Sequence, residues 1–353
     1  KSNGVGSNDV FRLTDMKGFG TVASEEFTKY TNFAISTDNL SISSSQEQLK
    51  FAVPMQYGFD GINPSAPIKT GTSISSANVM GFDCSASTKS GSVAYKRAID
   101  TISNPDEIDI NMLVTPGVIH SLHSSITNHA IDTIESRADA FYIMDGSRWG
   151  ASVSNAVSNV AGVDNNYVAT YFPWVQISNP GGGPQLWVPP SVVMLGVFSQ
   201  NDRIGQEWFA PAGLNRGGIA ALDVKKVLTH TDRDELYDGK VNPIASFPGQ
   251  GIVAFGQKTL QSRPSALDRI NVRRLLINLK KFIASSSRFL VFEQNTAATR
   301  NRFLNIVNPY MESVQQRSGL SAFRVVMDDS NNTPEVVDRN QLIGQIFIQP
   351  TRT

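Results

Sequence analysis

The alternation of helical and strand-like segments between residues 91 and 172 restricts the fold more than any other feature of the sequence. Apolar spacing predicts these elements in chain order: a helix at 93–102, a strand at 108–114, a helix at 118–135, a strand at 140–145, a helix at 152–160 and a strand at 168–172. Strands joined by helices need crossover connections, which favour a parallel sheet. We therefore expect an α/β fold, mixed α+β overall, with a central mostly parallel sheet flanked by helices.

The residues before this region have a different composition. Residues 1–75 are rich in Ser, Thr, Asn and Gly, and turn residues separate short β-type runs at 10–13, 33–35, 40–42 and 51–53. This pattern predicts a β-rich N-terminal portion that precedes the sheet.

Residues 207–276 combine a tightly bent loop with the start of a long helix. The loop at 208–218 contains two aromatic residues, a proline and three glycines, which suit a compact backbone turn. Its candidate structural residues are Trp208, Pro211, Gly213, Asn215 and Arg216. Ser265 and Asp268 then fit a Ser-x-x-Asp capping signature, and an apolar stripe predicts a helix at 265–283.

The last 50 residues predict a C-terminal α+β portion. A second apolar stripe runs from Phe303 to Val314, and Pro309 interrupts it, so we expect either a kink or two consecutive helices. Strand patterns at 322–327 and 341–348 follow.

The sequence lacks the motifs that would make this α/β chain an enzyme. It has no Gly-x-Gly-x-x-Gly, no phosphate-binding Gly-x-x-x-x-Gly-Lys-Ser/Thr and no Gly-x-Ser-x-Gly elbow. His120 and His123 could share a helix face as metal ligands do, but no third ligand has suitable spacing, which favours local hydrogen bonding. We expect no catalytic residue, cofactor or metal.

Composition excludes further classes of function. The chain of 353 residues has 31 Lys plus Arg and 31 Asp plus Glu, so its net charge is zero and does not favour nucleic acid or an anionic membrane. No run of 18 apolar residues exists that could span a bilayer. The lone Cys84 cannot form an internal disulfide, which fits a reducing compartment. Both ends of the chain are typical of cuts within a longer protein.

Several separated blocks of sequence resemble one family. The segment Trp-Phe-Ala-Pro-Ala-Gly-Leu-Asn-Arg-Gly at 208–217 is followed by Asn-Pro-Ile at 242–244 and by Asp-Arg-Ile-Asn-Val-Arg-Arg-Leu at 268–275. The resemblance continues at Ser286, Arg288, 292–293, Asn295, 331–334 and 348–350. These blocks resemble the contractile tail sheath proteins of myophages over roughly the last 150 residues. The likeness holds in outline at 109–203 and is slight at 1–75.

The resemblance implies a domain division and a mechanical function. Residues 1–75 would be the β-rich part of an outward-facing inserted domain, 76–206 the α/β core, and 207–353 a C-terminal α+β domain that faces the tube and links subunits. The chain would polymerise helically around a tail tube and contract to drive the tube through the host envelope. Its partners would be other copies, the tail tube protein, and baseplate and tail terminator proteins, without nucleic acid or stable membrane association. It would be found in the virion, and in the host cytoplasm during assembly.

The helix at 265–283 also begins a strongly basic segment. Residues 263–302 contain nine Lys or Arg residues against Asp268 and Glu293. Arg273 with Lys280, and Arg274 with Lys281, repeat at seven residues and predict a basic face. An ordinary solvated face would give the same pattern, and RNA or DNA binding is less favoured because no aromatic residue interleaves with the basic residues at 269–281. In a sheath, this face would bind the tube or a neighbouring subunit through Arg269, Arg273, Arg274, Lys280 and Lys281. Changing the last four of these to Glu is expected to weaken assembly without unfolding the core.

The final strand is a second candidate for contact between subunits. If its outer edge is unpaired, the backbone there can accept a strand from another chain. The family resemblance implies this linkage, and the residues concerned would be Leu342, Ile343, Ile346, Phe347 and Ile348.

Two alternatives remain open. The chain could be the sheath of a type VI secretion system or of a bacteriocin-like contractile injection system. A more remote alternative is a nucleotide-binding or hydrolytic α/β enzyme, with its ligand at the carboxyl end of the sheet.

Overall fold

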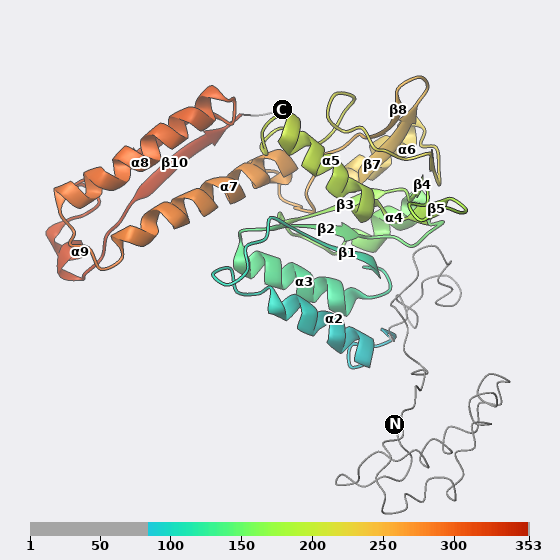
Figure 1. Cartoon of the computed structure of the whole chain (residues 1–353), viewed down its shortest axis with the longest axis horizontal. Coiled ribbons are helices and arrows are strands. Elements are labelled where there is room, and N and C mark those ends of the chain that lie inside the picture. The colour runs from blue at the N-terminus through green and yellow to red at the C-terminus, as the bar shows by residue number, and fades with distance from the viewer. Residues whose placement is uncertain (1–83, 352–353) are drawn as a thin grey trace, which may run out of the picture. The chain divides into compact units, whose positions relative to one another are not determined.

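The computed structural model describes residues 84–351, and the β-rich portion predicted for residues 1–75 lies outside them. Helices and strands alternate through the first part of this region (Figure 1). The helices are α2 (Ser90–Thr101), α3 (Ser124–Arg137), α4 (Val153–Val160), α5 (Pro190–Ile204) and α6 (His230–Asp238). The larger strands are β1 (Met112–Ile119), β2 (Phe141–Asp145), β3 (Val168–Phe172), β7 (Asn242–Phe247) and β8 (Gly251–Ala254).

These strands form one sheet in the order β1-β2-β3-β7-β8. The first four are parallel, and β8 pairs antiparallel with β7. Every residue of β2 and β3 is buried, because both faces of the sheet are covered. The predicted mostly parallel sheet is confirmed.

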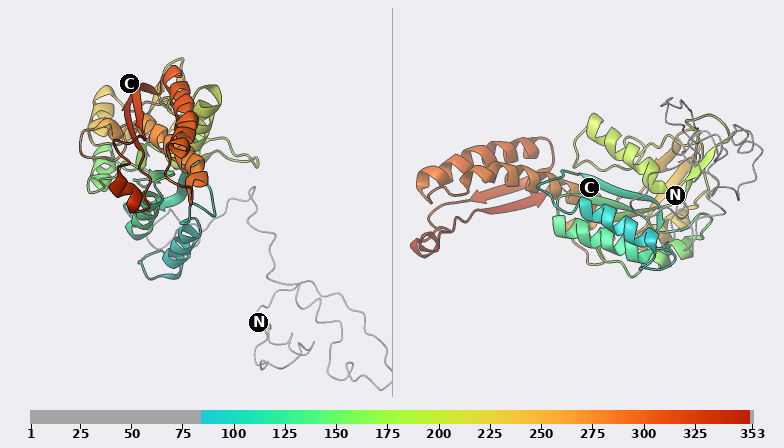
Figure 2. Two further views of the ribbon diagram at one scale, coloured as in Figure 1. Left: turned by 90° about the vertical axis from the view of Figure 1, so that its left-hand side faces the viewer. Right: turned by 60° about the horizontal axis from the view of Figure 1, so that its bottom comes forward.

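Helices cover the two faces of this sheet. Residues of α2, α3, α4 and α6 share one apolar cluster with one face of the strands. Residues of α5 and of the first half of a later helix, α7 (Ile270–Ser287), share a second cluster with the other face. Figure 2 shows α2 and α3 on the side of the sheet opposite α5. We call the region from residue 84 to residue 254 the α/β subdomain.

A second, smaller sheet lies beside the first. It contains β4 (Val175–Ile177), β5 (Leu186–Val188) and β6 (Asp223–Val224), all antiparallel. The glycine-rich run at 179–184 belongs to the connection between β4 and β5. The sequence did not predict these strands, because two or three residues are too few to display a period of two.

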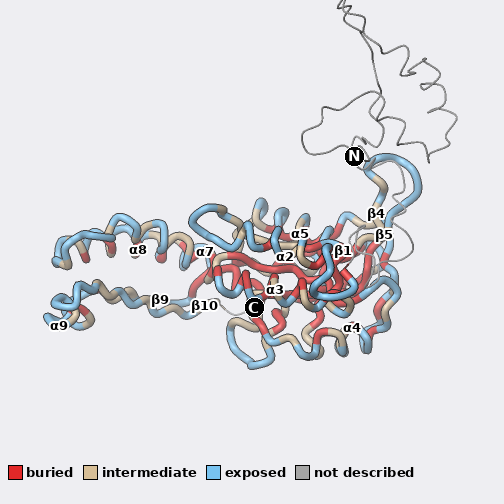
Figure 3. Tube along the Cα trace, turned by 90° about the horizontal axis from the view of Figure 1, so that it is seen from below, coloured by how far each residue is buried: buried red, intermediate tan, exposed pale blue. Residues whose placement is uncertain are grey.

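The remaining elements form the C-terminal subdomain, residues 266–351. They are the 3₁₀ turn η2 (Ala266–Asp268), helix α7, the 3₁₀ turn η3 (Arg288–Leu290), α8 (Ala297–Gln316), β9 (Leu320–Val326), α9 (Pro334–Asp338) and β10 (Gln345–Pro350). A third apolar cluster joins α7, α8, β9 and β10, with Trp208 from the preceding loop. Burial is continuous along the central sheet and confined to one side of α8 (Figure 3).

Three predicted element boundaries are wrong. The strand predicted to end before Pro116 continues to Ile119, with an irregular register after Val114, so the helix predicted from residue 118 starts only at Ser124. Ser265 accepts a hydrogen bond from Leu267 and caps only the 3₁₀ turn; α7 begins separately at Ile270.

The second apolar stripe forms one helix. Pro309 lies inside α8, so the expectation of two consecutive helices is wrong. Proline is accommodated there because residue 309 is exposed, and water can therefore reach the carbonyl that its missing N–H would have bonded.

The division expected after residue 206 would cut the main sheet in two. Strands β7 and β8 follow that position, yet they pair with β3 and with each other. Strands on both sides of residue 206 therefore belong to one sheet.

Candidate functional site

The five basic residues predicted to bind a partner lie on or beside α7, and the structure uses most of them within the chain. Arg273 is only 7% exposed and Arg274 only 5%. Arg273 donates to the Asn166 side chain, and its guanidinium lies 4.0 Å from the centre of the Tyr167 ring. Burial lowers the pKa of Arg273 from its usual value.

Arg274 makes the most complete of these contacts. Its Nη1 and Nη2 donate to the two carboxylate oxygens of Asp202 at 2.8 and 2.6 Å. Nη1 also donates to the Glu207 carbonyl at 3.1 Å. This two-pronged geometry is the strongest form of an Arg–carboxylate pair, and it joins α7 to the end of α5.

The other three residues differ in their exposure. Lys281 donates from Nζ to Asp109 at 2.6 Å, to Asn111 at 2.6 Å and to the Ile110 carbonyl at 2.7 Å, and its bond and charge lower the pKa of Asp109. Arg269 contacts the Tyr237 hydroxyl and Asp268. Lys280 is exposed and has no ion pair with any residue from 84 to 351.

The exposed basic face predicted for α7 is therefore wrong. The seven-residue spacing does place these side chains on common faces of the helix, but α7 is enclosed on two sides. Its apolar stripe packs on α8, and the face that carries Arg273 and Arg274 packs on the α/β subdomain. Glu at these two positions would place carboxylates in the core, so the fourfold substitution does not test partner binding.

The acidic partners of this segment were not singled out in the sequence. Asp106, Asp109, Asp202 and Asp329 each pair with a cation from residues 274–300. One signal pointed to them: a segment with an excess of seven cations lies in a chain of zero net charge. Anions elsewhere in the same chain were available to neutralise it.

The loop at 208–218 packs against both subdomains. Trp208 is buried in the C-terminal apolar cluster, and its Nε1 donates to the Arg317 carbonyl at 3.1 Å. Gly213 has φ of 81° and donates its N–H to the Ala254 carbonyl on β8, at 2.8 Å. Pro211 is buried and Asn215 exposed. The loop therefore fixes the C-terminal subdomain against the edge of the main sheet.

A polar network strengthens the same connection. Asn278 on α7 donates to the Glu207 carboxylate at 3.1 Å and accepts from the Tyr310 hydroxyl on α8. Tyr310 also stacks on Phe282, with ring centres 3.6 Å apart. Together with the Arg274 pair, these contacts tie α5, α7 and α8 together.

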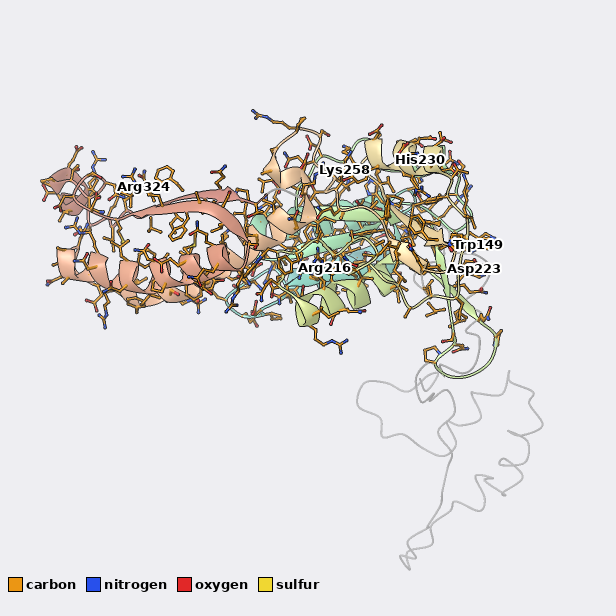
Figure 4. The ribbon with its side chains drawn as sticks, turned by 90° about the horizontal axis from the view of Figure 1, so that it is seen from above. Trp149, Arg216, Asp223, His230, Lys258 and Arg324 are labelled. Atoms are coloured by element: carbon orange, nitrogen blue, oxygen red, sulfur yellow. The ribbon has the colours of Figure 1, made fainter. Side chains whose placement is uncertain are left out.

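A hollow opens at this connection. It has a volume of about 180 Å³. Trp208, Val272 and Leu275 are buried in its wall, whereas Arg216 is half-buried in the wall. Figure 4 shows Arg216 among the side chains beside α5.

The predicted linking strand is present as β10. It pairs only with β9, in antiparallel register from Gln345 opposite Val326, so among residues 84–351 its second edge has no strand partner. Ile346 and Ile348 pack on the C-terminal cluster, and Phe347 on the opposite face is 56% exposed. Leu342 and Ile343 precede the strand, where the Asn332 side chain holds both the N–H and the carbonyl of Ile343.

The histidines form local bonds in place of a metal site. His123 accepts at Nδ1 from the Ile119 N–H, His120 Nδ1 lies 2.7 Å from Thr127 Oγ1, and His129 Nε2 lies 2.6 Å from Asp100. Within the described part of the chain, no group of His, Cys, Asp and Glu has the arrangement of a metal site. No helix in that part is long and apolar enough to cross a membrane.

The carboxyl end of the parallel sheet, where such folds often bind ligands, holds a buried carboxyl group. Asp145 ends β2 and accepts from the N–H and hydroxyl of Ser191, at 3.1 and 2.7 Å, in the first turn of α5. Burial raises the pKa of Asp145 to about 7. This carboxyl group caps a helix.

Asp145→Asn should reveal this titration. The folded-state pKa lies above the unfolded value of 3.8, so the contribution of Asp145 to stability is full below pH 4 and is lost as the pH rises to about 7. The loss is at most about 4 kcal/mol at about 1.4 kcal/mol per pKa unit. Urea unfolding from pH 4 to pH 8 should show wild type losing stability relative to the variant. A constant difference across this range would contradict the raised pKa.

Comparisons with known proteins agree along most of the chain. A model of the phage tail sheath protein central domain matches residues 88–260, and a model of the phage tail sheath C-terminal domain matches residues 262–353. The change of model lies after β8, so both β7 and β8 fall within the central-domain match.

Curated relatives carry the same description. The chain is 30% identical over 298 residues to the tail sheath protein of Vibrio phage KVP40, covering 77% of this chain and 44% of that protein. It is 31% identical over 286 residues to the tail sheath protein of Enterobacteria phage T4, covering 72% and 42%. The chain spans less than half the length of these relatives.

Two solved structures share the fold. One is the sheath complex of PVC, an extracellular contractile injection system, in its contracted state, with a TM-score of 0.63, 24% identity and 72% of each chain covered. The other is the contracted helical sheath of the anti-feeding prophage, with a TM-score of 0.59, 24% identity, and 73% and 71% covered.

Proposed function

The chain belongs to the family of phage tail sheath proteins, and we propose that it is the subunit of a contractile tail sheath. Many copies polymerise in a helical array around a tail tube. The array then shortens and drives the tube through the host envelope. Head-to-tail contacts of this kind are heterologous and leave the symmetry open, as a long array requires.

The observation that carries this proposal is the order of the two family matches. The central and C-terminal domain models follow each other with one residue between them and cover both subdomains. The curated relatives are named as tail sheath proteins of phages, which favours a phage tail over a secretion system. Those relatives are structural proteins, and this supports a function without catalysis.

Linkage between subunits is proposed at the free edge of β10. A strand from a neighbouring copy can pair with its backbone, because that edge has no partner within residues 84–351. Ile346, Phe347 and Ile348 would form this linkage, and Leu342 and Ile343 would lie just before the paired residues. Such backbone pairing can persist while subunits rotate against each other.

The partners and location follow from the same proposal. Baseplate and tail terminator proteins would contact the two ends of the array, and the tail tube protein would occupy its central channel. Of the five basic residues, Lys280 is the one that stays available for the tube, because the others bind their own chain. The protein would assemble in the host cytoplasm and reside in the virion.

Electron microscopy of the natural-length protein, expressed alone beside this 353-residue chain, tests the proposal. We expect long hollow tubes from the natural-length protein and monomers from the chain. A natural-length protein that stays monomeric and also ignores added tail tubes would rule out a sheath.

A further inference from the structure

The loop between α7 and α8 carries an aromatic residue that no residue from 84 to 351 covers. Phe292 is fully exposed, and its neighbour Val291 is 60% exposed. Phe292 also has φ of 70°, which is a genuine outlier for a bulky residue. Such a conformation persists only where the surrounding structure imposes it.

The base of this loop is firmly held. Leu290 packs in the C-terminal apolar cluster, and the Glu293 N–H donates to the Leu290 carbonyl at 3.1 Å. Asn295 donates from its side chain to the Gln341 carbonyl at 2.9 Å and to Asn332 at 3.2 Å. Phe292 is therefore presented to the outside from a fixed support.

The hollow beside Trp208 has the size and lining to accept an aromatic ring. Its volume is about 180 Å³, and the apolar side chains of Trp208, Phe209, Val272 and Leu275 line it together with the polar side chains of Asn271, Ser318 and Thr351. A cavity of about 150 Å³ lined by apolar side chains binds benzene. A phenyl side chain that enters the hollow would therefore leave water and contact the apolar part of this lining.

The charges beside the two features are complementary. Arg216 lies in the wall of the hollow, with its guanidinium 5.1 Å from the centre of the Phe209 ring. Glu293, which follows Phe292, is exposed. Within residues 84–351, neither Arg216 nor Glu293 takes part in an ion pair. Arg216 could therefore bind the carboxylate of Glu293 and also lie over an incoming ring.

One copy cannot bring these features together. Leu275 in the hollow and Ser287 at the end of α7 are twelve residues apart, or about 18 Å at 1.5 Å per residue. Phe292 lies further along the chain still, in the connection that leads into α8 at the end of the C-terminal subdomain away from the main sheet (Figure 1).

We propose that Phe292 of one copy inserts into the hollow of a second copy, with Glu293 of the first bound to Arg216 of the second. The contact joins different surfaces of the two copies, so it is heterologous, as the contacts of an open helical array are. It rests on the proposed function and adds the residues of one contact between copies.

Charge exchange tests the pairing in the natural-length protein. Glu293→Arg and Arg216→Glu are each expected to raise the protein concentration needed for tube formation about tenfold, and the double variant should recover most of this loss. Glu335→Arg on α9 is the matched control, since Glu335 is exposed and, within residues 84–351, pairs only with Arg339. Sedimentation and electron microscopy measure assembly, and circular dichroism checks folding.

Cysteine crosslinking gives a second test that does not depend on the charged variants folding. Phe292→Cys with Ala210→Cys should give a ladder of disulfide-linked copies on oxidation, and neither single variant should. The native Cys84 is buried and should not react. Normal assembly by both single charge variants, or no ladder within assembled tubes, would overturn the pairing and leave the sheath proposal standing. A wild-type protein that never assembles would overturn both.

Discussion

Arg274→Ala is expected to lower the free energy of unfolding by about 3 kcal/mol, because it removes one partner of a buried ion pair. Arg274 holds both carboxylate oxygens of Asp202 and the Glu207 carbonyl, and it lies 5.0 Å from the centre of the Phe198 ring. Asp202 retains some contact with water, which keeps the loss at the lower end of the range for such pairs.

Arg288→Ala is the matched control. Arg288 pairs with Asp106, and both side chains are largely exposed, so the expected loss is less than about 0.5 kcal/mol. Urea unfolding of both variants at neutral pH makes the comparison. Arg274→Met with Asp202→Leu should lose less than Arg274→Ala, since no charge is then left unpaired. Equal losses for Arg274→Ala and Arg288→Ala would show that Arg274 does not hold the subdomains together.

Gly217→Ala should cost at least about 2 kcal/mol, because the loop at 208–218 leaves no space for a side chain there. A Cβ atom at Gly217 would lie 2.6 Å from the Ala254 carbonyl oxygen and 2.7 Å from the Gly213 nitrogen. Both are backbone atoms that cannot rotate away. The loop and β8 would have to separate. This would lengthen the hydrogen bond that the Gly217 carbonyl accepts from the Ala254 N–H at 2.8 Å.

Gly218→Ala provides the comparison at the adjacent position. A Cβ atom at Gly218 would meet nothing within 4 Å, so the expected change is within about 0.5 kcal/mol. Both substitutions reduce the freedom of the unfolded chain to the same degree, and this effect cancels in the comparison. Thermal unfolding of the two variants side by side measures the difference. A similar melting temperature for both would mean that the loop is not tightly packed against β8.

Much of the main sheet could be predicted because β2 and β3 are short, largely apolar and separated by a helix. β7 could not, because Pro243 is its second residue and proline usually argues against a strand. The structure explains the exception through Asn242, whose side chain donates to the carbonyls of Thr170 and Lys258 and accepts from the Lys258 N–H. The Asn242 side chain thus supplies hydrogen bonds beside Pro243, which has no N–H to donate to a neighbouring strand.

The candidate site was predicted less well, for a reason that α7 makes clear. Its apolar stripe followed from spacing alone. Its basic residues were assigned to solvent because periodicity reports which residues share a face and not what covers that face. Ile270 and Ile277, which pack on the α/β subdomain, were the sign of a second buried face. The hollow at Trp208 joins residues from 208 to 351, and no local pattern predicts such a set.

Helix α7 runs without a break from its contacts with the α/β subdomain into the C-terminal subdomain. A rotation of its first half would therefore also move its far end. Its 18 residues extend about 27 Å at 1.5 Å per residue. Rotation of its buried first half by roughly 10° would therefore move its far end by about 5 Å, close to the spacing of neighbouring strands in a sheet. Such a rotation of the α/β subdomain would thus move the far end of the C-terminal subdomain by about one strand spacing.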